Sequence, residues 1–331
     1  MFGPKSGLRV IAALAITAVS IATSPAAAQA APETYPSTVK FLSDKFVNGK
    51  ALDGFSPGVP DYGFTLEAML QRRAAGQKLA DKLFIPAKAV LADSTSIKKS
   101  IVSTYAYDTD KKIKPGVAGK FLFTSVAIGA PNAPLRNAVV ADLKKAIAAN
   151  GSIAVSAGNT FDYAWAILGL ATNKQTKLAN TVAMSLVKLQ RPDGGFGMDQ
   201  TGDNTKSSAD ATGIALQALS LAKRSATKSQ AAVQQKSIIS AAKYLRTIQV
   251  GSTHWEAWGD VDVNGTAYAA MGLKAAGANI TAIQGWLKTR VAPTGGLTTP
   301  WSNGQGDAFA TAQGYVPLLG LSYLNLIPVK K

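Results

Sequence analysis

The sequence predicts an all-α fold, an (α/α)6 toroid in which six helix hairpins form an inner and an outer ring. Three observations predict it. A pattern of helix ends recurs along the chain, a nearly uncharged helix follows each copy, and these helices are regularly spaced. Because a single hairpin buries only one face, repeated hairpins must stack on their neighbours.

The recurring pattern consists of four residues at spacings of 4, 4 and 2. The first two lie one turn apart on one face of a helix. The third, usually Gly, marks where that helix stops, as a C-terminal cap requires. The fourth is apolar and folds back against the helix end. Four copies follow the pattern: Leu143, Ile147, Gly151 and Ile153; Leu186, Gln190, Gly194 and Phe196; Leu245, Gln249, Thr253 and Trp255; Leu287, Val291, Gly295 and Leu297.

Each copy leads to a second helix that is rich in Ala and Gly and almost free of charge. A helix that is apolar nearly all round is buried, whereas the preceding segments, such as 179–190 and 237–249, are amphipathic. Each hairpin therefore pairs an amphipathic outer helix with a buried inner helix. Inner helices buried on every side favour a closed ring over an open superhelix. We expect them to begin near residues 61, 116, 160, 209, 262 and 307.

The first 30 residues predict a secretory signal peptide. Lys5 and Arg9 precede an uncharged apolar run, residues 10–21, and Ala28 and Ala30 supply small residues for cleavage. The run is shorter than the roughly 20 residues that a membrane span needs, although an uncleaved anchor is the alternative. We therefore expect a secreted or cell-envelope protein with a single domain over residues 31–331. The chain has no cysteine, which excludes disulfides, thiolate catalysis and cysteine-bound zinc.

The chain is strongly basic, with 35 Lys and Arg against 19 Asp and Glu. The surplus favours acidic wall polymers as partners, and the alternative is a solvated surface that keeps the protein soluble. Residues 72–120 hold 11 of the basic residues, in the one unit whose inner helix lacks a leading Asp and whose outer part, 77–114, is longer. Few aromatics interleave there, so we expect no nucleic acid. We also expect a monomer, no metal and no cofactor.

The stretch that begins at Gln190, Gln-Arg-Pro-Asp-Gly-Gly-Phe-Gly, resembles the repeat of squalene–hopene cyclases and protein prenyltransferase β-subunits. In that repeat an aromatic–aliphatic pair precedes a Gln, a Gly and a Trp. The copy from Tyr244 to Trp255 matches it, with Thr253 in place of the Gly. The resemblance extends over most of the chain after residue 30 and implies the α/α-toroid fold of the terpenoid cyclase and prenyltransferase superfamily.

The catalytic signatures of these families do not recur. The cyclases protonate an alkene with Asp-x-Asp-Asp, and the nearest string here, Asp260-Val261-Asp262-Val263, lacks the final Asp. The prenyltransferases bind zinc through Asp, Cys and His, whereas this chain has no Cys and a single His, His254. A toroid hosts several functions, so the resemblance predicts the fold and leaves the activity open.

Five inner helices begin with an Asp. Because all inner helices of a toroid point the same way, these Asps should gather at one mouth of the central cavity, which makes that mouth the expected ligand site. An Asp in the first turn also caps a helix, which is the structural interpretation. Polar and aromatic residues within two turns complete the predicted ligand-binding set: Asp61, Tyr62, Asp162, Tyr163, Trp165, Asp210, Asp262, Asn264, Tyr268, Asp307 and Gln313.

Catalysis has three weak candidates, Asp210, Asp262 and Glu256. Glu256 belongs to a polar cluster with His254 and Asp260 that could form an acid–base or metal site, or a solvated loop. Our first hypothesis is a non-catalytic, exported binder of an apolar, isoprenoid or glycan ligand, small or polymeric, in the central cavity. The alternatives are a divergent terpenoid cyclase or glycan-cleaving enzyme and a wall-associated structural module.

Overall fold

The computed structural model describes residues 35–47, 51–54, 56–77, 90–91, 93–130, 132–153, 159–198 and 206–328. The predicted signal peptide and part of the basic segment therefore lie outside the described residues. Residues Glu33–Lys331 form one compact unit. No helix in the described part of the chain has the length and apolar character needed to cross a bilayer.

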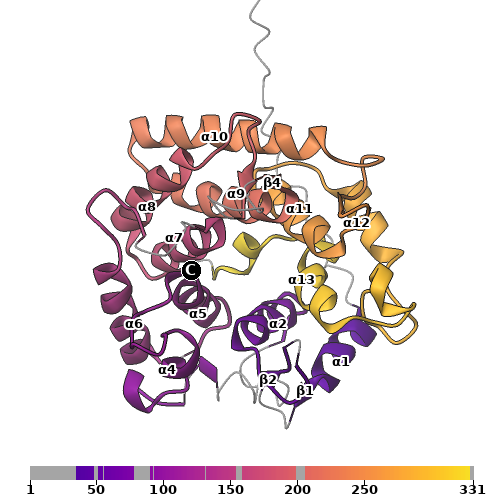
Figure 1. The fold of residues 1–331 in the computed structure, drawn as a ribbon, viewed down its shortest axis with the longest axis horizontal. Coiled ribbons are helices and arrows are strands. Elements are labelled where there is room, and N and C mark those ends of the chain that lie inside the picture. The colour runs from indigo at the N-terminus through magenta and orange to yellow at the C-terminus, as the bar shows by residue number, and fades with distance from the viewer. Residues whose placement is uncertain are drawn as a thin grey trace, which may run out of the picture. The chain divides into compact units, whose positions relative to one another are not determined.

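Six helices of the described residues form the inner ring (Figure 1). Each contacts the next, and the last contacts the first, so the ring is closed. The predicted α/α-toroid is thereby confirmed, and every inner helix begins within one residue of its predicted start. The inner helices are α2 (Tyr62–Ala74), α5 (Pro115–Ala127), α7 (Thr160–Thr172), α9 (Ala209–Lys223), α11 (Val263–Ala275) and α13 (Ala308–Leu318).

The outer helices alternate with the inner ones along the chain and surround them (Figure 1). The irregular second unit has the shortest described outer helix, which follows a 3-10 turn, η2 (Ile97–Lys99). The outer helices are α1 (Pro36–Asp44), α4 (Val102–Tyr105), α6 (Ala133–Lys145), α8 (Thr176–Lys188), α10 (Lys228–Thr247) and α12 (Thr281–Lys288).

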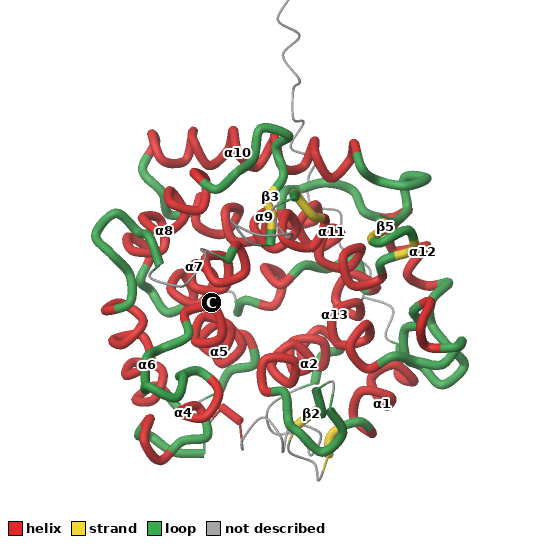
Figure 2. Tube along the Cα trace, in the orientation of Figure 1, coloured by secondary structure: helices red, strands yellow, loops and turns green. Residues whose placement is uncertain are grey.

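Short hairpins precede three of the inner helices (Figure 2). Each joins two antiparallel strands of two residues, and in the second hairpin Phe196 pairs with Ser208. The sequence analysis did not predict these strands, since strands of two residues leave no periodic signal. The pairs are β1 (Phe46–Val47) with β2 (Ala51–Leu52), β3 (Phe196–Gly197) with β4 (Ser207–Ser208), and β5 (Glu256–Ala257) with β6 (Asp260–Val261).

The fourth residue of the repeat is held in place by a hydrogen bond to a buried threonine. In four units the backbone N–H of this residue, or of its counterpart Leu52, donates to a Thr hydroxyl four residues after the N-cap of the next inner helix. The bond ties the loop to the first turns of the helix and satisfies a buried donor. The four donor–acceptor pairs are Leu52 with Thr65 at 2.9 Å, Phe196 with Thr212 at 2.9 Å, Trp255 with Thr266 at 3.0 Å, and Leu297 with Thr311 at 2.8 Å.

The glycines at the third position of the repeat do not cap the outer helices, so that prediction is wrong. Helix α8 has its C-cap at Leu189, and Gly194 lies in the turn that follows. Gly194 has a φ of +90°, and a Cβ there would come within 2.7 Å of the Ser240 carbonyl oxygen. Only glycine therefore combines the left-handed backbone with this close approach to the next outer helix.

The C-terminal segment fills one end of the ring. Its 3-10 helix, η5 (Tyr323–Leu326), contacts α2, α9 and α11 (Figure 1). The Tyr323 ring is fully buried, with its centroid 5.5 Å from that of Trp165 and 6.2 Å from that of Phe123. These neighbours lie in the middle of their helices, so the C-terminal segment packs inside the ring.

Candidate functional site

Three of the leading aspartates are true N-caps. The carboxylate oxygen Oδ1 of Asp61 accepts from the Phe64 N–H at 2.8 Å, and that of Asp262 accepts from the Gly265 N–H at 2.8 Å. Asp307 holds the start of α13 in the same way. The structural interpretation therefore applies to each of them, because a capping carboxylate satisfies backbone N–H groups that have no partner within the helix.

The other two aspartates act differently. Helix α9 is capped by Ser208, and Asp210 lies in its first turn. Asp162 lies in the first turn of α7 and accepts from the Gly116 N–H at 3.1 Å. Gly116 belongs to α5, the inner helix that has no leading Asp of its own. Asp162 thus supplies a carboxylate to the N-terminus of the neighbouring helix.

The N-terminal ends of the inner helices surround a cavity of about 600 Å³, which we call the central cavity. Six residues of the predicted ligand-binding set line it, together with residues outside that set. The lining residues from the predicted set are Asp61, Asp210, Asp262, Asn264, Tyr268 and Gln313, and the main additional ones are Phe64, Glu67, Lys120, Asn159, Phe161, Met198, Trp258 and Phe309.

Glu67 is the centre of a polar network inside the ring. Its side chain is buried, pairs with the Lys120 ammonium, and accepts from the Tyr268 hydroxyl at 3.0 Å. The Gln313 amide donates to its second oxygen at 2.8 Å and accepts from the Asn264 amide at 2.7 Å. The network joins α2, α5, α11 and α13 and presents fixed donors and acceptors to the cavity. Such a network holds its members in one arrangement when every member is satisfied.

Burial changes the acid–base properties of two lining residues. Burial raises the pKa of Asp262 above the usual aspartate range, and the negative charge of Asp210 raises it further, while the backbone hydrogen bond from Gly265 opposes the shift. Burial also raises the pKa of Tyr268 well above its usual value, and the Glu67 carboxylate adds to this rise. Tyr268 therefore remains a hydroxyl donor at physiological pH.

Aromatic rings cover part of the wall and the rim. Phe161 meets Tyr268 edge to face at 5.4 Å, and Phe64 lies 4.7 Å from Phe309 between ring centroids. At the rim, Trp258 occupies the turn between β5 and β6 with 97% of its surface exposed. Its φ is +54°, a conformation that non-glycine residues adopt rarely. The hairpin therefore holds a large apolar ring in water at the edge of the cavity.

Five predicted residues lie elsewhere. Tyr163 is buried, and its hydroxyl accepts from the Ile153 N–H at 3.1 Å, in the place that Thr takes in other units. Trp165 is buried below Lys120, whose amine lies 5.1 Å from the ring centroid. Tyr62 faces a second pocket, and Asp162 and Asp307 serve the helix ends described above.

The polar cluster at Glu256 does not form a compact site. His254 Nε2 is 3.8 Å from Glu256 Oε1, and the His254 ring stacks on Trp286 with centroids 4.8 Å apart. Asp260 accepts from its neighbouring Val261 N–H at 2.7 Å. Nowhere in the described ranges do three His, Asp or Glu side chains converge as metal ligands would.

The central network leaves a signal in the sequence. Charged residues are rare in the buried inner helices, and Glu67 and Lys120 are two of them. A buried charge requires a partner, so an acid in one buried helix and a base in the next predict an ion pair. Trp258 gave no such signal, because exposure depends on the turn that carries it.

Solved structures with the same ring exist among proteins of different function. A type II terpene cyclase, MstE from Scytonema, is similar with a TM-score of 0.64 at 14% identity, over 86% of this chain and 96% of that chain. An inactive α-1,6-mannanase variant of Salegentibacter sp., in complex with α-1,6-mannotriose, gives 0.59 at 11%, over 88% and 98%. Haptocorrin in complex with Cbi gives 0.58 at 13%, over 88% and 67%. No family model and no curated protein matches the sequence.

These similarities establish the terpenoid cyclase-like α/α-toroid fold. At sequence identities between 11% and 14%, the similarity shows the fold alone. The same ring occurs in a terpene cyclase, in a mannanase and in haptocorrin. The function must therefore be argued from the lining of the cavity.

Proposed function

We propose that this protein is an exported, non-catalytic glycan-binding toroid that holds its ligand in the central cavity. The observation that carries the proposal is the composition of the cavity wall. Carboxylates, amides and one ammonium line it beside aromatic rings. Sugars combine hydroxyl groups, which exchange hydrogen bonds with carboxylates and amides, with apolar C–H faces that pack on aromatic rings.

The lining argues against a hydrocarbon ligand. An isoprenoid chain would cover Asp210 and Asp262, which are only partly buried, without offering them a hydrogen bond. Removing polar groups from water in this way costs on the order of 1–3 kcal/mol for each group. Of the ligands that the sequence left open, a glycan therefore fits best, and the mannotriose complex of the similar mannanase illustrates that the fold accommodates one.

A glycan-cleaving enzyme is the second candidate, and the Asp262 carboxyl favours it. Its pKa is raised by burial and by the charge of Asp210, which also lines the cavity. Glycoside hydrolysis uses two carboxyl groups, one of which acts as a general acid with a raised pKa. The hydrogen bond from Gly265 to Asp262 supports the binding function instead, since it uses the carboxyl to hold a helix end.

Location and partners belong to the same proposal. The features of residues 1–30 support export, and the surplus of Lys and Arg supports contact with acidic polymers of the cell envelope. We propose a monomer, because one ring contains the whole cavity.

The test is a binding screen on the purified chain without residues 1–30. A glycan array and calorimetric titration with α-1,6-mannooligosaccharides and chitooligosaccharides are compared with farnesol and geranylgeraniol. We expect saccharide binding and a blue shift of tryptophan emission, since stacking would remove Trp258 from water. Trp258→Phe should lose the shift, whereas Trp301→Phe, which changes another exposed tryptophan outside the central cavity, should keep it.

Three results would contradict the proposal. Binding of the prenyl alcohols alone would assign an apolar ligand, and absence of any binding would reject the cavity as a ligand site. Release of shorter saccharides that stops in Asp210→Asn and Asp262→Asn would assign the enzyme instead.

A further inference from the structure

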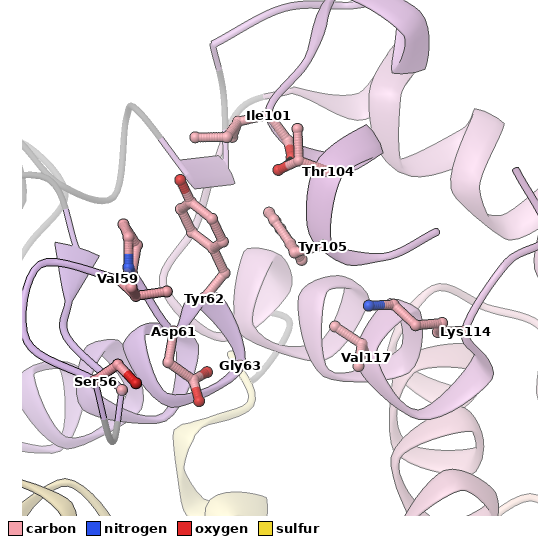
Figure 3. Close-up of a pocket in the computed structure, with 12 residues that line it drawn as sticks. Ser56, Val59, Asp61, Tyr62, Gly63, Ile101, Thr104, Tyr105, Lys114 and Val117 are labelled. Atoms are coloured by element: carbon pink, nitrogen blue, oxygen red, sulfur yellow. Dashed lines mark hydrogen bonds between the residues drawn. The ribbon is translucent and has the colours of Figure 1, made fainter. Parts of the chain in front are cut away.

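Two further pockets continue the central cavity to one side. The outer pocket, of about 810 Å³, lies between the start of α2, helix α4 and the start of α5 (Figure 3). It shares Asp61 and Gly63 with the central cavity. A third pocket of about 460 Å³, the edge pocket, shares Thr104 and Lys114 with the outer pocket. The three spaces therefore follow one another from the centre of the ring to its edge.

The central cavity and the outer pocket adjoin at the first turn of α2, whose residues line both. Gly63 forms part of this junction and carries no side chain. A Cβ at this position would lie 3.3 Å from Asp61 Oδ1 and 3.9 Å from Lys120 Nζ. A side chain here would crowd the Asp61 carboxylate, so glycine keeps the first turn of α2 free of a side chain where the two pockets share their lining.

The outer pocket has the same mixed character as the central cavity. The Tyr62 and Tyr105 rings stack with centroids 5.1 Å apart, and the Tyr105 hydroxyl donates to the Val90 carbonyl at 2.9 Å, which fixes its ring. Figure 3 shows the Lys114 amine directed into the pocket from the α5 side. Asp61, Ser56 and Thr104 add further polar groups, and aromatic rings together with polar and charged groups suit a sugar unit.

We propose that these three pockets form one groove that binds a linear glycan chain, with one part in the central cavity and the rest running over α2 and α4 to the ring edge. The inference rests on the proposed glycan function and deepens it, because it assigns a polymer rather than a compact ligand. Two observations support the proposal. Neighbouring pockets share lining residues, and each pocket is lined by at least one aromatic ring together with charged groups.

The experiment compares chain lengths. α-1,6-Mannooligosaccharides and chitooligosaccharides from disaccharide to octasaccharide are titrated calorimetrically into the wild type and into Thr104→Trp, which fills the outer pocket from its exposed side. We expect the wild-type affinity of the series that binds to rise at least about tenfold from the shortest to the longest chain. Thr104→Trp should bind the shortest chain within about twofold of the wild type and lose this rise.

Two further variants complete the experiment, one as a matched control and one as a second test of the groove. Thr247→Trp is the matched control, since Thr247 is also an exposed helical threonine whose hydroxyl bonds to its own helix, outside the three pockets. It should retain the full length dependence. Lys114→Ala removes the charged wall without adding bulk, and it should weaken long chains only, which tests the groove even if Thr104→Trp unfolds.

The outcomes separate the two proposals. If no saccharide of any length binds, the glycan function itself is wrong. If short and long chains bind equally well, or if Thr104→Trp and Lys114→Ala both keep the wild-type length dependence, the glycan function stands and the extended groove is rejected.

Discussion

Asp61 and Asp262 each serve the fold and the cavity at once. In both residues the Oδ1 atom holds a helix end, and the residue also lines the central cavity. One carboxylate carries two oxygens with several acceptor sites, so a cap uses only part of its capacity. Capping and ligand binding are therefore compatible roles, and the cap itself aims the carboxylate at the mouth of the ring.

The raised pKa of Asp262 predicts how the stability of the folded protein changes with pH. Burial and the Asp210 charge raise this pKa in the folded chain, so the folded state holds the proton more tightly than the unfolded state. The contribution of this group to the free energy of unfolding is greatest below the ordinary aspartate pKa and falls as the pH rises through the raised pKa. We expect Asp262→Asn to gain stability relative to the wild type as the pH rises from about 3 to about 7.

Thermal unfolding of both proteins across this pH range measures the effect. Asn remains a good N-cap, so the substitution chiefly removes the charge. Asp307→Asn, which changes a cap outside the central cavity, is the control for loss of a capping carboxylate. A constant difference between Asp262→Asn and the wild type at every pH would contradict the expectation.

At the scale of the elements, glycine pairs set the closest contacts between inner helices. A Cβ on Gly213 of α9 would come within 2.2 Å of the Tyr268 carbonyl oxygen on α11, and one on Gly272 would come within 2.5 Å of the Gly213 oxygen. Gly119 and Gly169 form the same kind of crossing between α5 and α7. The small residues that the sequence analysis noted in these helices thus permit the helix backbones to touch.

We expect Gly213→Ala to destabilise the fold by about 1–3 kcal/mol or more, because the methyl group meets backbone atoms that cannot move separately from their helix. Urea unfolding followed by circular dichroism measures the change. Gly285→Ala is the matched control, since Gly285 lies in outer helix α12 with open space around its Cβ position. It should stabilise the fold by about 0.5–1 kcal/mol. Equal effects of the two substitutions would reject this account of the packing.

On the scale of the whole molecule, the ring is closed in two ways. Contacts between α13 and α2 join its last and first inner helices, and η5 fills one end. The bond from the Tyr323 N–H to Gln217 at 3.0 Å anchors that segment to α9. Residues near the C-terminus therefore help to hold the inner helices together.

We therefore expect Tyr323→Ala to cost about 3–5 kcal/mol, as truncation of a fully buried aromatic residue does. Equilibrium unfolding in urea gives the value, and Tyr323→Phe, which keeps the ring, should cost less than about 1.5 kcal/mol. Wild-type stability of Tyr323→Ala would mean that the C-terminal segment is not part of the core.

The ring, its six repeats and the positions of the inner helices could be predicted from the amino-acid sequence alone. This was possible because helix starts depend on local features, namely a capping residue followed by an uncharged run of small and apolar residues. The Thr bonds were also within reach, since Thr65, Thr266 and Thr311 each follow a capping Asp by four residues.

The set of predicted residues that share the cavity could not be predicted from the sequence, because it depends on contacts between distant segments. Tyr268 and Gln313 reach Glu67 across 201 and 246 residues of sequence, and a periodic pattern holds no information on such pairs. Every inner helix presents several apolar faces, so the sequence could not distinguish the face of Tyr163, which packs on a loop, from that of Tyr268, which lines the cavity. The closure of the ring fixes the rotation of each helix, and this rotation determines which side chains meet.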